Sequence, residues 1–211
     1  MKDLDQLVEL TARVLRDTPP PCRLPAAYLF AQTEDNEASV LGAGLELLCG
    51  ERIEVLRLPG CPAIAGYPGF DHWQANLVAA GAPPQRIEAV ALEVAAGINT
   101  KVEAEAAVRL ALARGDCALA VVAAPFHQLR AFMTAVRVAL AEHTALRLYS
   151  FPGLALPWAE QVTHSQGTVS ATRAGLIEPE LRRIERYTEK GDLIQVHQVL
   201  DYLDQRERSI Q

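Results

Sequence analysis

Short apolar runs alternate with longer amphipathic segments along most of the chain. The apolar runs predict five buried strands, at residues 26–31, 52–58, 87–92, 117–123 and 146–151. Between them, apolar side chains recur every three or four residues, which predicts helices, and glycines end several of these segments. The run 117–123 is the most apolar, so we expect its strand to be central.

Strands that alternate with helices form β-α-β units, which predict an α/β fold with a mainly parallel sheet covered on both faces. We divide the chain into residues 1–24, an N-terminal helix and a proline-rich connector, residues 25–153, the sheet domain, and residues 154–211.

The last part of the chain, 154–211, begins with a polar stretch (154–176) that has no clear period, so we expect an irregular loop there. Two extra C-terminal helices follow, packed on the same domain or burying a second subunit of a homo-oligomer. Their apolar side chains are expected to be buried: Leu181, Ile184, Leu193, Val196, Leu200 and Leu203.

Composition narrows the classes of function. The chain has 211 residues, half of them hydrophobic, and a net charge of −6, which indicates one globular domain and disfavours a nucleic-acid surface. Acidic residues near the start argue against a secretory signal, and the longest apolar run, 117–126, is too short to cross a bilayer. The four cysteines form no Cys-x-x-Cys pair, so neither a zinc site nor a disulfide framework is expected. These features predict a cytoplasmic protein without a membrane partner.

Ligands of an open parallel sheet bind beyond the carboxyl ends of its strands. This rule selects four loops: 32–36, 59–69, 93–100 and 125–130. We expect the loop 152–168 to cover them.

The fourth loop leads directly into a helix, so His127 is expected at a helix N-terminus, where the dipole favours an anion and a neutral imidazole. Arg130 lies three residues on, on the same face, and can hold a phosphate or carboxylate with two parallel hydrogen bonds. His127 is therefore the candidate catalytic residue, as general base or donor, and Arg130 the candidate anion clamp. The alternative is that His127 caps the helix and Arg130 pairs with an acid.

The other loops offer weaker candidates. Thr100 with Glu103 has the spacing of a capping box, whereas Asn99 either shapes the turn or points its amide at a ligand. Glu34 and Asp35 either bind a ribose or a metal ion or form a solvated helix start. No Gly-x-Gly-x-x-Gly fingerprint follows the first strand, so an ordinary dinucleotide site is not expected.

Three stretches resemble the YdcF/SanA/ElyC-like family, whose domain has no defined function. Residues 81–87 resemble its G-V-P-x-x-x-I step, Glu93 with Asn99-Thr100 its E…S-x-N-T stretch, and residues 123–131 its T-S-x-F-H-x-x-R-A stretch. The order and spacing agree over residues 26–152. The chain departs from the family where Gln32 to Asn36 replace a glycine-rich turn, and we do not expect the membrane anchor of envelope-associated relatives.

The resemblance implies a Rossmann-like three-layer α/β/α fold with a small-ligand pocket. Its lining would include Asn99, Thr100, His127 and Arg130, with Glu93 from the second stretch. The ligand it suggests is an anionic or adenosine-type molecule, such as S-adenosylmethionine, a nucleotide or a phosphorylated metabolite.

Two functions stay open from the sequence: a transferase or hydrolase, or a binding or regulatory module without turnover. A second catalytic group near His127 would favour the enzyme, and the candidates are Glu34, Asp35, Glu93 and His164.

Overall fold

A computed structural model describes residues 2–18, 20, 22–93, 97–164 and 168–209. Five parallel strands form one sheet in the order β3-β2-β1-β4-β5, which confirms the predicted α/β class and Rossmann-like architecture. The strands are β1 (Leu24–Leu29), β2 (Ile53–Gly60), β3 (Ile87–Ala91), β4 (Ala118–Val122) and β5 (Arg147–Ser150). The α-helices are α1 (Lys2–Leu15), α2 (Glu34–Cys49), α3 (Phe70–Ala79), α4 (Thr100–Ala113), α5 (Pro125–Ala141), α6 (Ile177–Glu189) and α7 (Val196–Arg208).

The middle strand is β1, and the more apolar β4 lies beside it. β1 also begins two residues before the predicted start and includes Pro25, which was expected to bound it. Both strands are buried because helices cover both faces, so successive side chains enter opposite cores. Tyr28 and Phe30 face one core, whereas Ala27 and Leu29 face the other.

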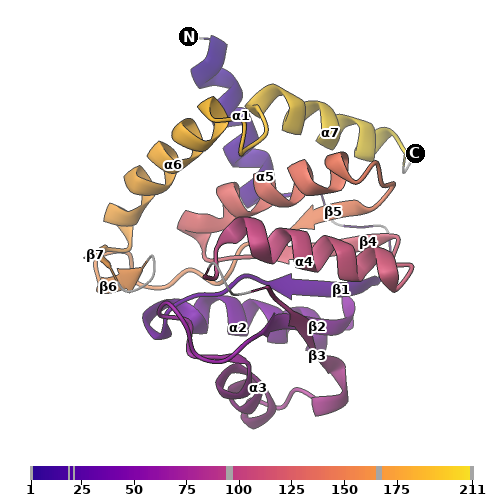
Figure 1. Ribbon diagram of the computed structural model, residues 1–211, viewed down its shortest axis with the longest axis vertical. Coiled ribbons are helices and arrows are strands. Elements are labelled where there is room, and N and C mark those ends of the chain that lie inside the picture. Colours follow the sequence, from indigo (N-terminus) through magenta and orange to yellow (C-terminus); the bar gives the residue numbers. More distant parts are fainter. Residues whose placement is uncertain (1, 19, 21, 94–96, 165–167, 210–211) are drawn as a thin grey trace.

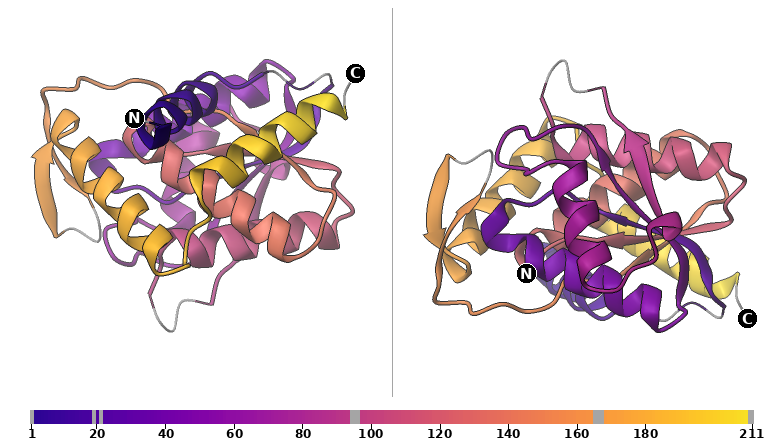
Figure 2. Two further views of the ribbon diagram at one scale, coloured as in Figure 1. Left: turned by 90° about the horizontal axis from the view of Figure 1, so that it is seen from above. Right: turned by 90° about the horizontal axis from the view of Figure 1, so that it is seen from below.

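Two layers of helices enclose the sheet, and a third lies outside one of them (Figure 1). Helices α2 and α3 cover one face, while α4 and α5 cover the other. Helices α1, α6 and α7 pack outside α5, where their apolar side chains complete the core that contains Tyr28 and Phe30. Figure 2 shows α6 and α7 crossing above α5. No helix of the described ranges is long and apolar enough to span a membrane.

The C-terminal helices bury most of the side chains predicted for them, but not all. Ile184, Leu193, Leu200 and Leu203 are buried and Val196 is partly buried. Leu181, however, is 40% exposed, so that prediction was wrong. The buried face of α6 carries Glu180 and Ile184, which are one turn apart. Leu181 follows Glu180 directly, so the helix rotates its side chain away from this buried face.

The outer edge of β5 is closed by side chains rather than by another strand. The Leu148 N–H donates to the Tyr202 hydroxyl at 2.7 Å, and Arg206 donates to the Leu148 carbonyl at 2.6 Å. The Ser150 N–H donates to Asp17 at 2.8 Å. Helix α7 and the connector after α1 therefore satisfy the backbone groups that an open edge would offer to another chain.

The sequence predicted an irregular loop over the polar stretch 154–176, but part of this stretch has regular structure. It contains an antiparallel hairpin of β6 (Gln161–His164) and β7 (Val169–Thr172), followed by a short 3-10 helix (Ala174–Leu176). The pattern was missed because four-residue strands rich in threonine and serine carry little apolar signal.

Buried Arg173 fixes this hairpin to the start of α2. It donates to Asn36 Oδ1 at 2.9 Å and to the Asp35 carbonyl at 2.6 Å, and it pairs with Glu160. The Thr163 N–H also donates to the Asp35 carboxylate at 2.6 Å. The hairpin is thereby placed beside the carboxyl ends of the strands.

Candidate functional site

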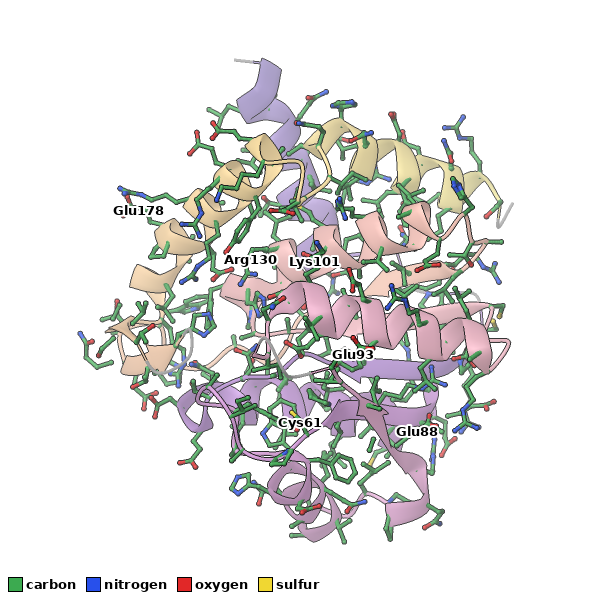
Figure 3. All side chains as sticks on the ribbon, in the orientation of Figure 1. Cys61, Glu88, Glu93, Lys101, Arg130 and Glu178 are labelled. Atoms are coloured by element: carbon green, nitrogen blue, oxygen red, sulfur yellow. The ribbon has the colours of Figure 1, made fainter. Side chains whose placement is uncertain are left out.

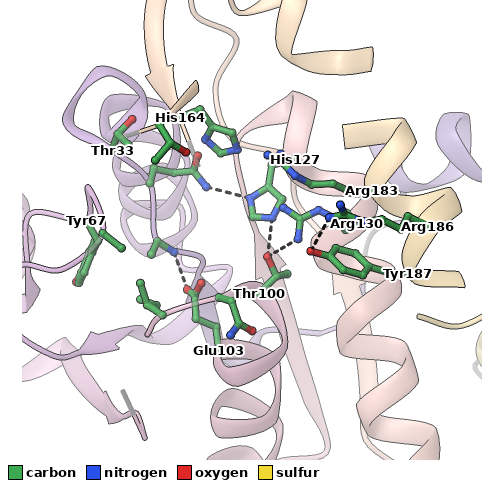
Figure 4. A pocket seen from close by; sticks show the side chains of 16 residues that line it. Thr33, Tyr67, Thr100, Glu103, His127, Arg130, His164, Arg183, Arg186 and Tyr187 are labelled. Atoms are coloured by element: carbon green, nitrogen blue, oxygen red, sulfur yellow. Dashed lines mark hydrogen bonds between the residues drawn. The ribbon is translucent and has the colours of Figure 1, made fainter. Parts of the chain in front are cut away.

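A cavity of about 320 Å³ lies at the carboxyl edge of the sheet, where the strand order reverses between β1 and β4. Ligands of doubly wound folds bind at this switch point. The loops after β1, β2, β3 and β4 all contribute to the lining, together with the β6–β7 hairpin and α6 (Figure 4). Its lining residues are Ala31, Gln32, Thr33, Ala65, Tyr67, Ile98, Asn99, Thr100, Glu103, His127, Arg130, His164, Thr168, Arg183, Arg186 and Tyr187.

His127 stands in the first turn of α5, as the sequence predicted, and is buried. Its Nδ1 lies 3.1 Å from Gln32 Nε2, and its Nε2 lies 3.1 Å from Thr100 Oγ1. Burial is the main reason that the pKa of His127 falls well below its usual value, and the nearby Arg130 guanidinium lowers it further. The imidazole is therefore neutral at physiological pH.

Arg130 lies one turn further along α5 and makes an ion pair with Glu180 on α6. Its Nε lies 2.5 Å and its Nη2 3.2 Å from the two carboxylate oxygens, and its Nη1 donates to Thr100 Oγ1 at 2.7 Å. The sequence predicted that Arg130 would hold an anionic ligand with two parallel hydrogen bonds. In the structure Arg130 makes these two hydrogen bonds to Glu180. Figure 4 shows Arg130 beside Thr100 and His127 in the cavity wall.

The start of α4 differs from the predicted capping box. Asn99, rather than Thr100, is the cap: its Oδ1 accepts from the backbone N–H groups of Lys101 and Val102, at 3.0 and 3.1 Å. Asn99 lines the cavity, but this leaves only its amide nitrogen for a ligand. Thr100 is released from capping, and its hydroxyl turns to His127 and Arg130 instead.

Glu103, the other member of that predicted box, is buried in the cavity wall. Its Oε1 accepts from the Ala31 N–H at 2.7 Å and from the Tyr28 hydroxyl at 3.3 Å. Burial raises the pKa of Glu103 to about 7, against the opposing effect of these hydrogen bonds. The group can therefore exchange a proton near neutral pH.

Replacement of Glu103 by glutamine should stabilise the protein at alkaline pH. A raised carboxyl pKa means that its stabilising effect is complete below the unfolded value of about 4.5 and is lost as the pH rises through about 7. Glutamine keeps the accepting oxygen but never ionises. We expect the free energy of unfolding to rise by roughly 3 kcal/mol at about pH 9 and to change little at about pH 4.

Chemical unfolding of Glu103→Gln at both pH values provides the measurement. Glu105→Gln, on the same helix, is the matched control and should change the stability less, because its side chain is only partly buried. An equal effect of Glu103→Gln at both pH values would contradict the raised pKa.

Several lining residues were missed by the sequence analysis. Gln32 was noted only as part of the first loop, and Arg183, Arg186 and Tyr187 lie on a helix that no motif linked to the site. The Arg186 guanidinium stacks on the Tyr187 ring at 4.8 Å and donates to its hydroxyl. Nothing local in α6 indicates which helix face meets the cavity.

Among the proposed partners of His127, His164 is the one in the cavity, with ring centroids 6.0 Å apart. Glu93 is exposed outside the lining (Figure 3), Glu34 is exposed at the start of α2, and Asp35 holds the hairpin. No group of three His, Cys, Asp or Glu side chains in the described ranges could hold a metal ion.

The positive charge in and around the cavity exceeds the negative charge. Arg130, Arg183 and Arg186 line it, against the carboxylates of Glu103 and the adjoining Glu180. Both acids are buried, and Glu103 is only partly ionised near neutral pH. Arg186 forms no ion pair with a carboxylate of the described residues, so an anionic ligand would meet an uncompensated cation.

A comparison of the chain with protein-family models, curated proteins and solved structures found no significant match.

Proposed function

We propose that the protein binds a small anionic molecule in the cavity at the carboxyl edge of the sheet. One observation carries this proposal: four strand-end loops, the hairpin and α6 enclose a polar cavity with excess arginine at the switch point. Such a cavity suits a charged metabolite better than an apolar one, because burial of an apolar ligand against these groups would leave them without partners.

A phosphorylated metabolite or a nucleotide fits this charge, and the resemblance to the YdcF-like family adds S-adenosylmethionine as a candidate. Arg183 and Arg186 form the cationic wall that the ligand's charge would face. The cytoplasmic location and the homo-oligomer stay predictions.

Catalysis, as a transferase or hydrolase, is favoured over a purely regulatory role by the titratable groups in the wall. A neutral imidazole at His127 and a carboxyl at Glu103 with a pKa of about 7 face one cavity. A carboxyl that exchanges a proton near neutral pH is suited to general acid–base catalysis, and a neutral imidazole beside it is suited to hydrogen bonding with a ligand. A regulatory module would bind the ligand without consuming it.

Mass spectrometry of the natively purified protein tests the proposal directly. We expect a retained small anion, whose mass also separates a nucleotide or S-adenosylmethionine from a simpler phosphorylated metabolite. Calorimetric titration with ADP, inorganic phosphate and S-adenosylmethionine should then give binding to at least one of these probes. A protein that retains nothing and binds none of them would contradict the proposal.

Arg186→Gln should weaken binding of the anionic probe by about tenfold, because a charge-assisted contact contributes about 1.4 kcal/mol. The melting temperature should hardly change, since Arg186 is exposed and holds no other element in place. Added salt should reduce the difference between wild type and variant.

Calorimetric titration measures this loss. The control is Arg109→Gln, which removes an exposed charge of α4 that pairs with Glu142 outside the cavity. Equal affinity of both variants would show that Arg186 does not face the anion.

A further inference from the structure

A row of hydrogen bonds in the cavity wall determines which groups are left to donate to a ligand. Gln32 Nε2 lies 3.1 Å from His127 Nδ1, and an amide nitrogen always donates, so Nδ1 is the acceptor (Figure 4). The neutral ring therefore carries its proton on Nε2, which donates to Thr100 Oγ1 at 3.1 Å. Of the two roles predicted for His127, general base or donor, this arrangement favours the donor.

The Thr100 hydroxyl keeps its own proton free for a ligand. Arg130 Nη1 also donates to Thr100 Oγ1, at 2.7 Å, so both lone pairs of this oxygen are occupied. Within the described ranges, no side chain or carbonyl accepts the hydroxyl proton in return. Thr100 is buried and lines the cavity, so a ligand there meets a hydrogen-bond donor whose orientation His127 and Arg130 fix.

One turn further along α4, Glu103 offers the opposite kind of group to the same cavity. Its Oε1 accepts from the Ala31 N–H and the Tyr28 hydroxyl, whereas its Oε2 accepts no hydrogen bond from a residue that the structure describes. Side chains three residues apart on a helix are neighbours, and Thr100 and Glu103 both line the cavity. A donor and a carboxylate acceptor therefore lie side by side in its wall.

We propose that the cavity selects an oxyanion that carries a proton, namely hydrogen phosphate or the singly protonated phosphate of a monoester. One phosphate oxygen accepts the Thr100 hydroxyl proton, and the P–OH group of the same phosphate donates to the Glu103 carboxylate. An oxyanion without a proton, such as sulfate, would bring its charge against that carboxylate and leave it without a donor. This inference rests on the proposed function, since it names the class of anion that the cavity binds.

The arginines of the wall and the acceptor have different effects on an anion. Arg130, Arg183 and Arg186 attract phosphate and sulfate alike, because both carry negative charge. Discrimination between them requires a group that one anion satisfies and the other repels, and Glu103 is such a group. The proton between phosphate and carboxylate also removes the repulsion that two bare anions would have in a buried site.

Titration calorimetry of the full-length protein with inorganic phosphate and with sulfate tests this selection. At about pH 8 both ions are tetrahedral dianions, but hydrogen phosphate carries a proton and sulfate does not. Glu103, whose pKa is about 7, is then mostly ionised. We expect wild type to bind phosphate about ten- to hundredfold more tightly than sulfate at equal ionic strength, the usual effect of a hydrogen bond to a charged group.

Glu103→Gln should remove the preference, because an amide is uncharged and can donate to either anion. We expect its affinities for phosphate and sulfate to agree within about threefold. Glu105→Gln, on the same helix but outside the cavity lining, is the matched control and should keep the wild-type preference.

Thr100→Val removes a donor that both anions use. It should weaken the binding of phosphate and of sulfate by about tenfold each and leave the preference between them unchanged. Thr100→Ser, which keeps the hydroxyl, should bind both anions as wild type does. Wild-type affinity of Thr100→Val for phosphate would overturn the role of this hydroxyl.

The direction of the hydrogen-bonded row has a measurement of its own. A ¹⁵N NMR spectrum of the histidine rings, assigned by comparison with His127→Gln, should show His127 protonated on Nε2 and not on Nδ1. A proton on Nδ1 would make Nε2 the acceptor of the Thr100 proton. No donor would then be left for the ligand, and the inference would be overturned.

The two proposals fail differently. Equal binding of phosphate and sulfate by wild type, or a preference that persists in Glu103→Gln, would overturn the selection by Glu103 and leave the anion-binding proposal standing. Binding of ADP without binding of phosphate would have the same consequence. A protein that binds none of the anionic probes would overturn the proposed function itself.

Discussion

Replacement of Glu180 by glutamine is expected to lower the free energy of unfolding by about 3–5 kcal/mol, the usual cost of removing one partner of a buried ion pair. Glu180 is 2% exposed and accepts two hydrogen bonds from Arg130. Arg183 pairs with the same carboxylate, and His164 Nε2 lies 3.5 Å from it. The substitution leaves the Arg130 charge buried without a counter-charge, at the contact that joins α6 to α5.

The destabilisation should depend on pH in a defined direction. Burial alone would raise the pKa of Glu180, but the Arg130 charge holds it well below the usual value of 4.5. A depressed carboxyl pKa contributes stability above the unfolded pKa, and this is lost as the pH falls toward the folded value. The difference between wild type and Glu180→Gln should therefore be largest near neutral pH and shrink below about pH 4.5.

Denaturant unfolding of both proteins over this pH range is the measurement. Glu178→Gln is the matched control, because Glu178 lies on the exposed side of the same helix (Figure 3) and, among the residues that the structure describes, pairs with Arg182 alone. If Glu180→Gln were as stable as this control, the Arg130 guanidinium would not need the Glu180 carboxylate as a partner. Arg130 would then again be a candidate for binding an anionic ligand.

Arg206→Met should destabilise the protein to a similar extent, by about 3–5 kcal/mol. Arg206 donates to both oxygens of Asp17, whose side chain is 4% exposed, at 2.8 and 2.5 Å, and to the Leu148 carbonyl at 2.6 Å. Its guanidinium also lies 4.5 Å from the centre of the Tyr149 ring. Methionine fills similar space but leaves the Asp17 carboxylate without its counter-charge, with the Ser150 N–H still donating to it, and removes the donor of a carbonyl at the β5 edge.

Thermal and denaturant unfolding of Arg206→Met measure this loss, with Arg208→Met as control, because Arg208 is exposed on the same helix. The double variant Asp17→Asn/Arg206→Met should lose less free energy of unfolding than the two single variants lose together, because the two residues act as a pair. Additive effects would show that the two side chains stabilise the edge independently.

The sequence was sufficient for the parallel sheet and for the position of His127. Strand and helix periods are set by neighbouring side chains, and the run 117–126 leads directly into a helix whose first turn must lie at the sheet edge. The four loops selected by the strand-end rule all contribute to the cavity for the same reason.

Only the tertiary structure decided what those residues contact. Asn99 and Thr100 are both good helix caps; the spacing to Glu103 favoured Thr100, but the structure uses Asn99. Glu180 is fifty residues from Arg130 along the chain, so their ion pair depends on how α6 packs against α5. The same packing sends Arg183 and Arg186 into the cavity wall and frees Thr100 to meet His127. Local periodicity specifies elements and their faces, whereas contacts between distant elements are chosen by the packing of the whole core, which no short stretch of sequence contains.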